Sequence, residues 1–199
     1  LLSATFGAET ESYQYDALGR RVAIVSNSAP TSLIYEGPHV AQERDAWGID
    51  TRSYDYGPGI DWLLGFGAFS NGVLCGYFRC ITDIQGTVHA IVDESGVIVE
   101  RYEYDAWGRV LGVYDGSGVP LQRTACENRY LFQGREYSWV SGLYYFRARW
   151  YDPVTGQYKV VDLTGGSPYK LRVRTYVPAN DYANYFHLPY LPGLMCRMR

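Results

Sequence analysis

Long apolar runs and an excess of one charge are both missing from this chain of 199 residues. Because no stretch of about 18 apolar residues occurs, the sequence predicts no membrane-spanning helix. The formal net charge of −3 provides no attraction toward DNA or RNA. Residues 1–7 have no basic region and do not resemble a secretory signal. We expect from this start that the chain begins inside a longer repeat array or is a fragment of one.

Cysteine and histidine are scarce and widely spaced. The four cysteines are Cys75, Cys80, Cys126 and Cys196. The three histidines are His39, His89 and His187. The cysteines are too sparse for a disulfide framework and contain no CxxC pair, and the histidines lie far apart. The sequence therefore predicts no metal site, no cofactor and buried free thiols.

Tyrosine and glycine are abundant instead, with 20 and 22 residues. Tyrosine suits the half-buried surface of a pleated sheet, and glycine adopts the positive φ angles of tight turns. Hydrophobic residues make up 47% of the chain, which is enough for a core. No window longer than about ten residues shows a helical period. The sequence predicts an all-β fold, an antiparallel hairpin meander with a loop-rich or partly disordered C-terminal tail.

A Tyr-x-Tyr-Asp-x-x-Gly-Arg unit occurs twice. Alternation along a strand places both tyrosines on one face, where stacked units would align their rings into ladders. The aspartate opens a tight turn, the glycine takes its strained position, and the arginine can pair with the aspartate or stack on a ring. A single unit cannot bury its own face, so several must pack side by side. The members are Tyr13, Tyr15, Asp16, Gly19 and Arg20, and Tyr102, Tyr104, Asp105, Gly108 and Arg109.

Turn signals recur about every ten residues, which is typical of an antiparallel meander. The predicted strands are 12–16, 21–25, 53–61, 77–82, 88–92, 97–104 and 109–114. We expect two longer loops, a glycine-rich one at 65–76 and a second at 116–127 that leads into the next motif.

That second motif, residues 128–156, arranges aromatics, arginines and turn glycines as a pair of strands. We expect Arg147 and Arg149 to share a face and form a buried ion-pair cluster with Glu136 and Asp152. A ligand-binding arginine patch is the alternative. Residues 152–156 are predicted to form a turn in which proline presets φ. The signature residues are Phe132, Gly134, Arg135, Glu136, Gly142, Leu143, Tyr144, Tyr145, Arg147, Ala148, Arg149, Tyr151, Asp152, Pro153 and Gly156.

Together these two motifs resemble the C-terminal, repeat-associated core of the Rhs or YD-repeat family. The resemblance implies a spiral sheet that closes into a hollow shell, with upstream repeats of the same chain and a C-terminal effector as partners. It also implies a secreted or cell-envelope location. On this basis we divide the chain into a YD-repeat meander (1–127), a core motif (128–162) and a degenerate tail (163–199).

In toxin members of that family, two Asp-Pro-x-Gly elements are thought to supply an aspartyl-protease-like pair that cuts the chain and releases the toxic domain. Here the first aspartate corresponds to Asp162, where leucine replaces the expected proline. The second element is absent, since residues 186–189 contain Phe-His-Leu-Pro, and Asp181 fits the preceding segment better. Asp162 is thus either a remnant of a self-cleaving site or the cap of a turn.

The leading hypothesis is a structural module that closes a β-shell around a C-terminal effector. The first alternative is autoproteolysis through Asp162. The second is an adhesion surface on which the tyrosine rings stack against cell-surface glycans.

Overall fold

The computed structural model describes residues 3–147 and 149–160. Within these residues the regular structure consists of β-strands and one short 3₁₀ turn, which confirms the predicted all-β fold class. The strands of the first sheet are β1 (Ser3–Phe6), β2 (Glu9–Tyr15), β3 (Arg21–Ser26), β4 (Ala29–Glu36), β5 (His39–Arg44), β6 (Asp50–Tyr56), β7 (Leu63–Ser70), β8 (Val73–Thr82), β9 (Val88–Val92), β10 (Ile98–Tyr104), β11 (Val110–Asp115) and β12 (Pro120–Leu121). They form one sheet in sequential order, and every pairing is antiparallel.

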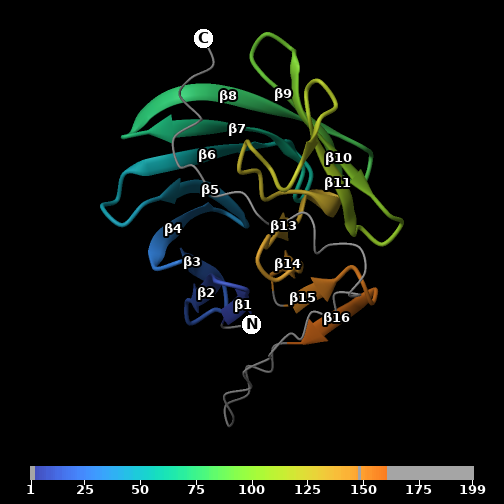
Figure 1. Cartoon of the computed structure of the whole chain (residues 1–199). Coiled ribbons are helices and arrows are strands. Elements are labelled where there is room, and N and C mark those ends of the chain that lie inside the picture. Colours follow the sequence, from blue (N-terminus) through green and yellow to red (C-terminus); the bar gives the residue numbers. More distant parts are fainter. Residues whose placement is uncertain (1–2, 148, 161–199) are drawn as a thin grey trace.

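A short 3₁₀ turn, η1 (Phe132–Gly134), leads into a second sheet. Its strands are β13 (Glu136–Tyr137), β14 (Tyr144–Phe146), β15 (Arg149–Asp152) and β16 (Gln157–Val160). The large sheet curls around this small one, so that β13 and β14 lie inside the curve (Figure 1). We refer to residues 124–160 as the inner segment. The hydrophobic core joins the two, because its buried residues come from both sheets.

Six hairpins of the large sheet are closed by an Asp-x-x-Gly turn, the turn chemistry that the sequence predicts. In each Asp-x-x-Gly turn, the aspartate Oδ1 accepts hydrogen bonds of 2.8–3.0 Å from the backbone N–H groups two and four residues further on. The glycine has a φ between 78° and 85°, a region that L side chains disfavour. These turns lie at residues 16–19, 45–48, 83–86, 93–96, 105–108 and 115–118. The turn at 45–48 was not among those predicted, although its spacing is the same.

The loop predicted at residues 65–76 is wrong, because β7 and β8 run through it. Two of the glycines that suggested a loop lie inside β7, where neighbouring side chains cover them. A Cβ on Gly65 would meet the Tyr77 hydroxyl at 2.7 Å, and one on Gly67 would meet Ser53 Oγ at 2.7 Å. Glycine within a strand marks a close approach of this kind. The loop predicted at 116–127 is also interrupted, by the short strand β12.

The repeated tyrosines lie on the inner face of one sheet, as predicted. Tyr13 and Tyr102 are buried, and Tyr15 and Tyr104 are partly buried. A third pair, Tyr54 and Tyr56, follows the same pattern in β6. None of the described residues forms a helix long and apolar enough to span a membrane.

Candidate functional site

Three glutamate–tyrosine pairs line the inner face of the large sheet. The Tyr13 hydroxyl donates to Glu11 at 2.5 Å, and the Tyr54 hydroxyl donates to Glu43 at 2.6 Å. The third pair joins the Tyr102 hydroxyl to Glu100. All three glutamates are buried. Burial and the adjacent carboxylate raise the pKa of each tyrosine well above its ordinary value, so the hydroxyls remain hydrogen-bond donors.

Each pair also holds a different part of the inner segment. Glu11 accepts a 2.5 Å hydrogen bond from Ser138 Oγ, and Glu43 forms an ion pair with Arg129. Glu100 accepts hydrogen bonds from the backbone N–H groups of residues 125 and 126, at 2.6 and 3.2 Å. Buried carboxylates need such partners, because an unpaired one would be strongly destabilising. The pairs therefore act as three polar attachment points between the large sheet and the inner segment.

The tyrosine rings are buried against the same segment. The ring centroids of Tyr13 and Trp150 lie 4.9 Å apart, as do those of Tyr54 and Tyr130. The Tyr102 hydroxyl accepts a 3.2 Å hydrogen bond from Asn128. The inner segment therefore buries these rings. The ladders of stacked rings that the sequence predicted are not what covers them. With Tyr102 only 3% exposed, the predicted glycan-stacking platform is not formed by this ring.

Arg21 lies at the centre of the interface between the two sheets. Its side chain is 2% exposed, forms an ion pair with Glu136, and lies 4.2 Å from the centroid of the Tyr145 ring. The rings of Tyr13 and Trp150 also face its guanidinium, at 5.4 and 5.7 Å. Burial lowers the pKa of Arg21, but Glu136 together with Tyr145 and Tyr13 outweighs this effect, so the net shift is upward and the cation is retained.

The arginine cluster expected within residues 128–156 has different partners from those predicted. Glu136 pairs with Arg21 of β3 and with Arg129, at 3.6 Å for the latter. Arg149 lies over the Tyr158 ring at 4.0 Å, and Asp152 contacts Lys159 at 3.7 Å. Arg21 comes from a strand distant in sequence, and Tyr158 and Lys159 come from the adjoining β16, so spacing along one strand does not reveal these partners.

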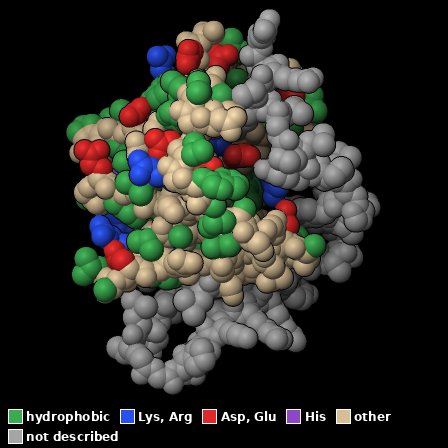
Figure 2. Space-filling view, turned by 90° about the vertical axis from the view of Figure 1, so that its left-hand side faces the viewer, with side chains coloured by type: hydrophobic (Ala, Val, Ile, Leu, Met, Phe, Trp, Pro, Cys, Tyr) green, Lys and Arg blue, Asp and Glu red, His purple; other side chains and the backbone are tan. Residues whose placement is uncertain are grey.

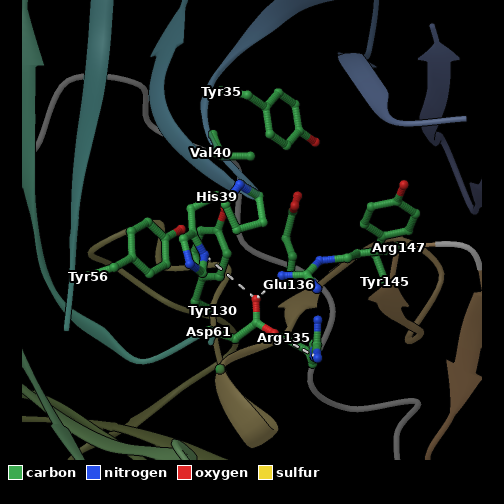
Figure 3. Close-up of a pocket in the computed structure, with 12 residues that line it drawn as sticks. Tyr35, His39, Val40, Tyr56, Asp61, Tyr130, Arg135, Glu136, Tyr145 and Arg147 are labelled. Atoms are coloured by element: carbon green, nitrogen blue, oxygen red, sulfur yellow. Dashed lines mark hydrogen bonds and ion pairs between the residues drawn. The ribbon is translucent and has the colours of Figure 1, made fainter. Parts of the chain in front are cut away.

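Asp61, in the loop between β6 and β7, lies in a pocket where it meets two arginines and a histidine. Arg135 Nη2 lies 2.7 Å from Asp61 Oδ2, and Arg147 Nη2 lies 2.8 Å from Asp61 Oδ1. His39 Nδ1 is 3.8 Å from the same Oδ1 and stacks on the Tyr56 ring with a centroid separation of 4.3 Å. Figure 3 shows Asp61 among these residues. Because both oxygens are engaged by cations, this carboxylate links the loop before β7 to the inner segment.

Several residues around Asp61 have positive φ angles. Asp61, Gln133, Gly134 and Arg147 all have φ between 53° and 63°. A Cβ on Gly134 would lie 2.1 Å from the carbonyl oxygen of Asp61, so only glycine fits. Arg147 follows β14 in the left-handed conformation. Contrary to the prediction, it therefore does not share a face with Arg149. Non-glycine residues keep such angles only where surrounding contacts enforce them.

The remaining residues of the second motif serve as turns and anchors. Gly142 and Gly156 have φ of 70° and 66°, as turn glycines do. The Tyr144 and Tyr151 hydroxyls donate to the carbonyls of residues 108 and 107, at 2.7 and 2.9 Å. The predicted turn at 152–156 is confirmed, since Asp152 Oδ1 accepts a 3.0 Å hydrogen bond from the N–H of Val154.

The two repeat arginines follow their turns directly in the sequence. Arg20 pairs with Asp16 at 2.8 Å and lies 5.3 Å from the centroid of the Tyr35 ring, so both predicted contacts form. Arg109 is half-buried after the equivalent turn.

Cys126 is buried as predicted, whereas Cys75 is exposed. Among the residues that the structure describes, no group of His, Cys, Asp or Glu is placed to hold a metal ion.

Asp162, Asp181, His187 and the predicted tail 163–199 lie outside the described residues. Self-cleavage through Asp162 therefore stays a prediction. The functional residues that sequence reasoning missed include Glu11, Glu43, Glu100, Asp61, Arg21 and Arg129. A Glu-x-Tyr spacing before the repeated tyrosines, at 11–13 and 100–102, was the available signal for two of them.

The described residues thus define a curled antiparallel sheet fastened by buried charges to its own C-terminal sheet. No protein-family model matches the chain. The chain is 34% identical over 157 residues to the tRNA nuclease WapA of Bacillus subtilis strain 168, a match covering 78% of this chain and 6% of that protein. It is also 28% identical over 181 residues to double-stranded DNA deaminase toxin A of Burkholderia cenocepacia, covering 78% of this chain and 12% of that one.

Solved structures share the fold. The crystal structure of TcdB2-TccC3-TEV matches with a TM-score of 0.56 and 18% identity, over 83% of this chain and 8% of that chain. The Photorhabdus luminescens Tc holotoxin pore matches with a TM-score of 0.55 and 16% identity, over 79% and 8% of the two chains. The chain is therefore a sequence relative of a short segment of WapA and has the fold of a segment of these toxin structures.

Proposed function

We propose that this chain is a shell-forming segment of an Rhs-type polymorphic toxin or cell-surface protein, and that it helps to enclose or present a C-terminal effector. The observation that carries the proposal is the inner face of the large sheet. Its buried charges attach an inner segment at three points, so the sheet is built to wrap around polypeptide. This arrangement supports enclosure, because the buried glutamates of the sheet are engaged in hydrogen bonds and an ion pair with the inner segment.

The relatives support the same proposal. The matched segments make up 6% of WapA and 12% of the deaminase toxin, both named for activities on nucleic acid. A segment shared by proteins named for different reactions fits a common scaffold better than either catalytic activity. We further propose that upstream repeats of the same chain pair with the edge strand β1, and that the whole protein is secreted or associated with the cell envelope.

A chimera tests the proposal. This chain replaces the matching segment of Bacillus subtilis WapA, and limited proteolysis followed by mass spectrometry measures how fast the C-terminal part is cut. We expect the C-terminal part to be cut as slowly in the chimera as in unmodified WapA, because the transplanted segment would close the same wall around it. Deleting the segment should remove that protection.

The matched variants are Arg21→Ala, which breaks the attachment of the wall to the inner segment, and Arg20→Ala, which changes an exposed neighbour. Protection should be lost in the first chimera and kept in the second. If the unmodified chimera is soluble but its C-terminal part is cut as fast as in the deletion variant, the segment does not close a shell.

The buried network also makes the stability of the chain depend on pH. Burial raises the pKa of Glu43, but Arg129 and Arg52 outweigh burial, so its pKa in the folded protein is lowered. A lowered pKa means that Glu43 stabilises the fold above about pH 4.5, its ordinary range, and that this stabilisation is lost as the pH falls through the folded value. In Glu43→Gln, the free energy of unfolding should fall less steeply below that pH.

Urea denaturation of the full chain at several pH values from roughly 3 to 7 measures this slope. Glu36→Gln is the control, since Glu36 is exposed and its loss should leave the slope as in the unmodified chain. Equal slopes for Glu43→Gln and the unmodified chain would show that Glu43 has the same pKa folded and unfolded.

A further inference from the structure

The pocket around Asp61 has a volume of about 50 Å³ and is open to solvent on one side. It lies between the β4–β5 hairpin, the loop after β6 and the inner segment (Figure 3). A single water molecule needs about 10–15 Å³ of such space, so the pocket has room for a small polar group. We call it the Asp61 pocket.

Aromatic rings form much of the pocket wall. Tyr130 and Tyr145 are buried, and Tyr35 and Tyr56 are partly buried. The side chain of Val40 adds apolar surface. Such walls keep the local dielectric constant low, so a hydrogen bond or an ion pair formed within the pocket is stronger than the same contact in water.

The pocket holds more positive charge than its carboxylates neutralise. Asp61 is the ion-pair partner of both Arg135 and Arg147. Among the residues that the structure describes, neither arginine has a second carboxylate within ion-pair distance. The other carboxylate that lines the pocket, Glu136, is already paired with Arg21. Two guanidinium groups thus share one carboxylate, and one positive charge is left without a counter-charge.

Arg135 also has a buried N–H group without a partner. Its Nη2 pairs with Asp61 at 2.7 Å, but no described residue accepts a hydrogen bond from its Nε. The guanidinium lies 4.7 Å from the centroid of the Phe146 ring. Burial lowers the pKa of Arg135, Asp61 offsets this only in part, and Arg147 adds to the decrease. A buried cationic donor in this state is destabilising unless another acceptor joins it.

The second arginine is not needed to neutralise Asp61. Arg135 alone supplies the opposite charge, yet Arg147 adopts a φ of 58° and places its Nη2 2.8 Å from Asp61 Oδ1. A left-handed backbone is unfavourable for residues other than glycine, and such conformations cluster at ligand clamps. A cation held in this conformation, beside a carboxylate that already has a partner, indicates an additional anion.

The excess of positive charge is local to the pocket. On the face of the molecule that Figure 2 shows, acidic and basic side chains are interspersed. The whole chain has a formal net charge of −3. An anion is therefore attracted by the pocket itself and not by a broad basic surface on that face.

We propose that the Asp61 pocket binds the carboxylate group of an organic acid or of an acidic side chain of a polypeptide. One carboxylate oxygen accepts the hydrogen bond from Arg135 Nε, and the other pairs with Arg147. Arginine is suited to this contact because its planar group matches the two oxygens of a carboxylate. The bound carboxylate completes the charge balance, and its hydrocarbon part lies against Val40 and the tyrosine rings. The site does not depend on the shell function proposed above.

The ring of His39 reports on the pocket, because its Nδ1 lies 3.8 Å from Asp61 Oδ1. The full chain is titrated with sodium acetate at constant pH and ionic strength, with acetate replacing chloride, and the proton resonances of the histidine rings are followed by NMR. We expect the His39 resonance to shift and saturate, with a dissociation constant of millimolar order for so small a ligand. His89, which is half-exposed and does not line the pocket, should not shift.

Arg135→Lys keeps the charge and removes the Nε donor, so it should weaken acetate binding by about tenfold. Arg147→Ala should weaken it by at least about fivefold. In that variant Asp61 keeps its pair with Arg135, so the chain should fold. Arg44→Ala is the matched control, since Arg44 is 40% exposed and 2.7 Å from Asp50, much as Arg147 is 45% exposed and 2.8 Å from Asp61. Because Arg44 does not line the pocket, its loss should leave the affinity for acetate unchanged.

N-acetylaspartate N-methylamide presents its carboxylate as a protein side chain does, and so separates the two sources of the ligand. Tighter binding of this compound than of acetate assigns the pocket to an acidic side chain, and equal or weaker binding assigns it to a free acid. No saturable shift of His39, or equal acetate affinity of Arg147→Ala and the unmodified chain, would overturn the proposal. Tighter binding of inorganic phosphate than of acetate would overturn the assignment to a carboxylate.

Discussion

Replacing Arg21 by alanine is expected to lower the free energy of unfolding by about 3–5 kcal/mol, the cost of breaking a buried ion pair by removing one partner. Arg21 is 2% exposed, and its guanidinium fills the space among Glu136 and the Tyr13 and Tyr145 rings. Alanine leaves a cavity and removes one of the cations that neutralise Glu136. Urea denaturation of the full chain measures the loss.

The adjacent Arg20 is a matched control. It pairs with Asp16 on the surface, and its side chain is 50% exposed, so Arg20→Ala should cost less than about 1 kcal/mol. A double-mutant cycle with Glu136→Ala separates the ion pair from the cavity, because only the pair shows as coupling between the two sites. Equal losses for Arg20→Ala and Arg21→Ala would mean that the two sheets are not held together through this cation.

Gly134→Ala is the second variant with a large expected effect, about 3 kcal/mol or more. Part of the loss is the left-handed conformation, which costs an L side chain roughly 1–2 kcal/mol, and part is overpacking, which costs roughly 1–3 kcal/mol. The new Cβ would lie 2.1 Å from a backbone oxygen of Asp61 and cannot be relieved by a rotamer change. The residue would be forced away from Asp61, and the contact of Arg135 with that carboxylate should weaken with it.

Gly37→Ala isolates the conformational part of this loss. Gly37 has a φ of 57°, close to the 63° of Gly134, but a Cβ there would have nothing within 4 Å. Its substitution should therefore cost only the backbone strain, roughly 1–2 kcal/mol. Denaturation midpoints of the two variants compare them directly. If Gly37→Ala were as destabilising as Gly134→Ala, the close approach to Asp61 would not be a constraint.

The hairpins were predictable because their cause is local. An aspartate and a glycine three residues later satisfy the turn's own N–H groups and supply its positive φ, whatever lies elsewhere in the chain. Alternation then places Tyr13 and Tyr102 on one face with no reference to a partner. Glycine was misleading in residues 65–76, as at Gly65 and Gly67, where its role depends on side chains of other strands.

The charge pairs of the interface were not predictable, because their members are distant in sequence. Arg21 and Glu136 are separated by 115 positions, and Arg147 and Asp61 by 86. Many carboxylates are equally available to each arginine along the chain. Which of them meet depends on how far the sheet curls and where the inner segment enters it, and no local pattern encodes either.

By itself, the sequence determined an all-β chain, the turns of its hairpins, the inward side of its tyrosines and the motif resemblance that led to the shell proposal. Only the tertiary structure decided that these tyrosines are buried by the chain's own inner segment, that three buried glutamates fasten this segment to the large sheet, and that Asp61 pairs with two arginines where the backbone takes positive φ angles. The physical reason is the range of the forces. Turn hydrogen bonds and strand alternation act within a few residues, whereas burial and ion pairing depend on contacts that exist only once the sheet has curled around the inner segment.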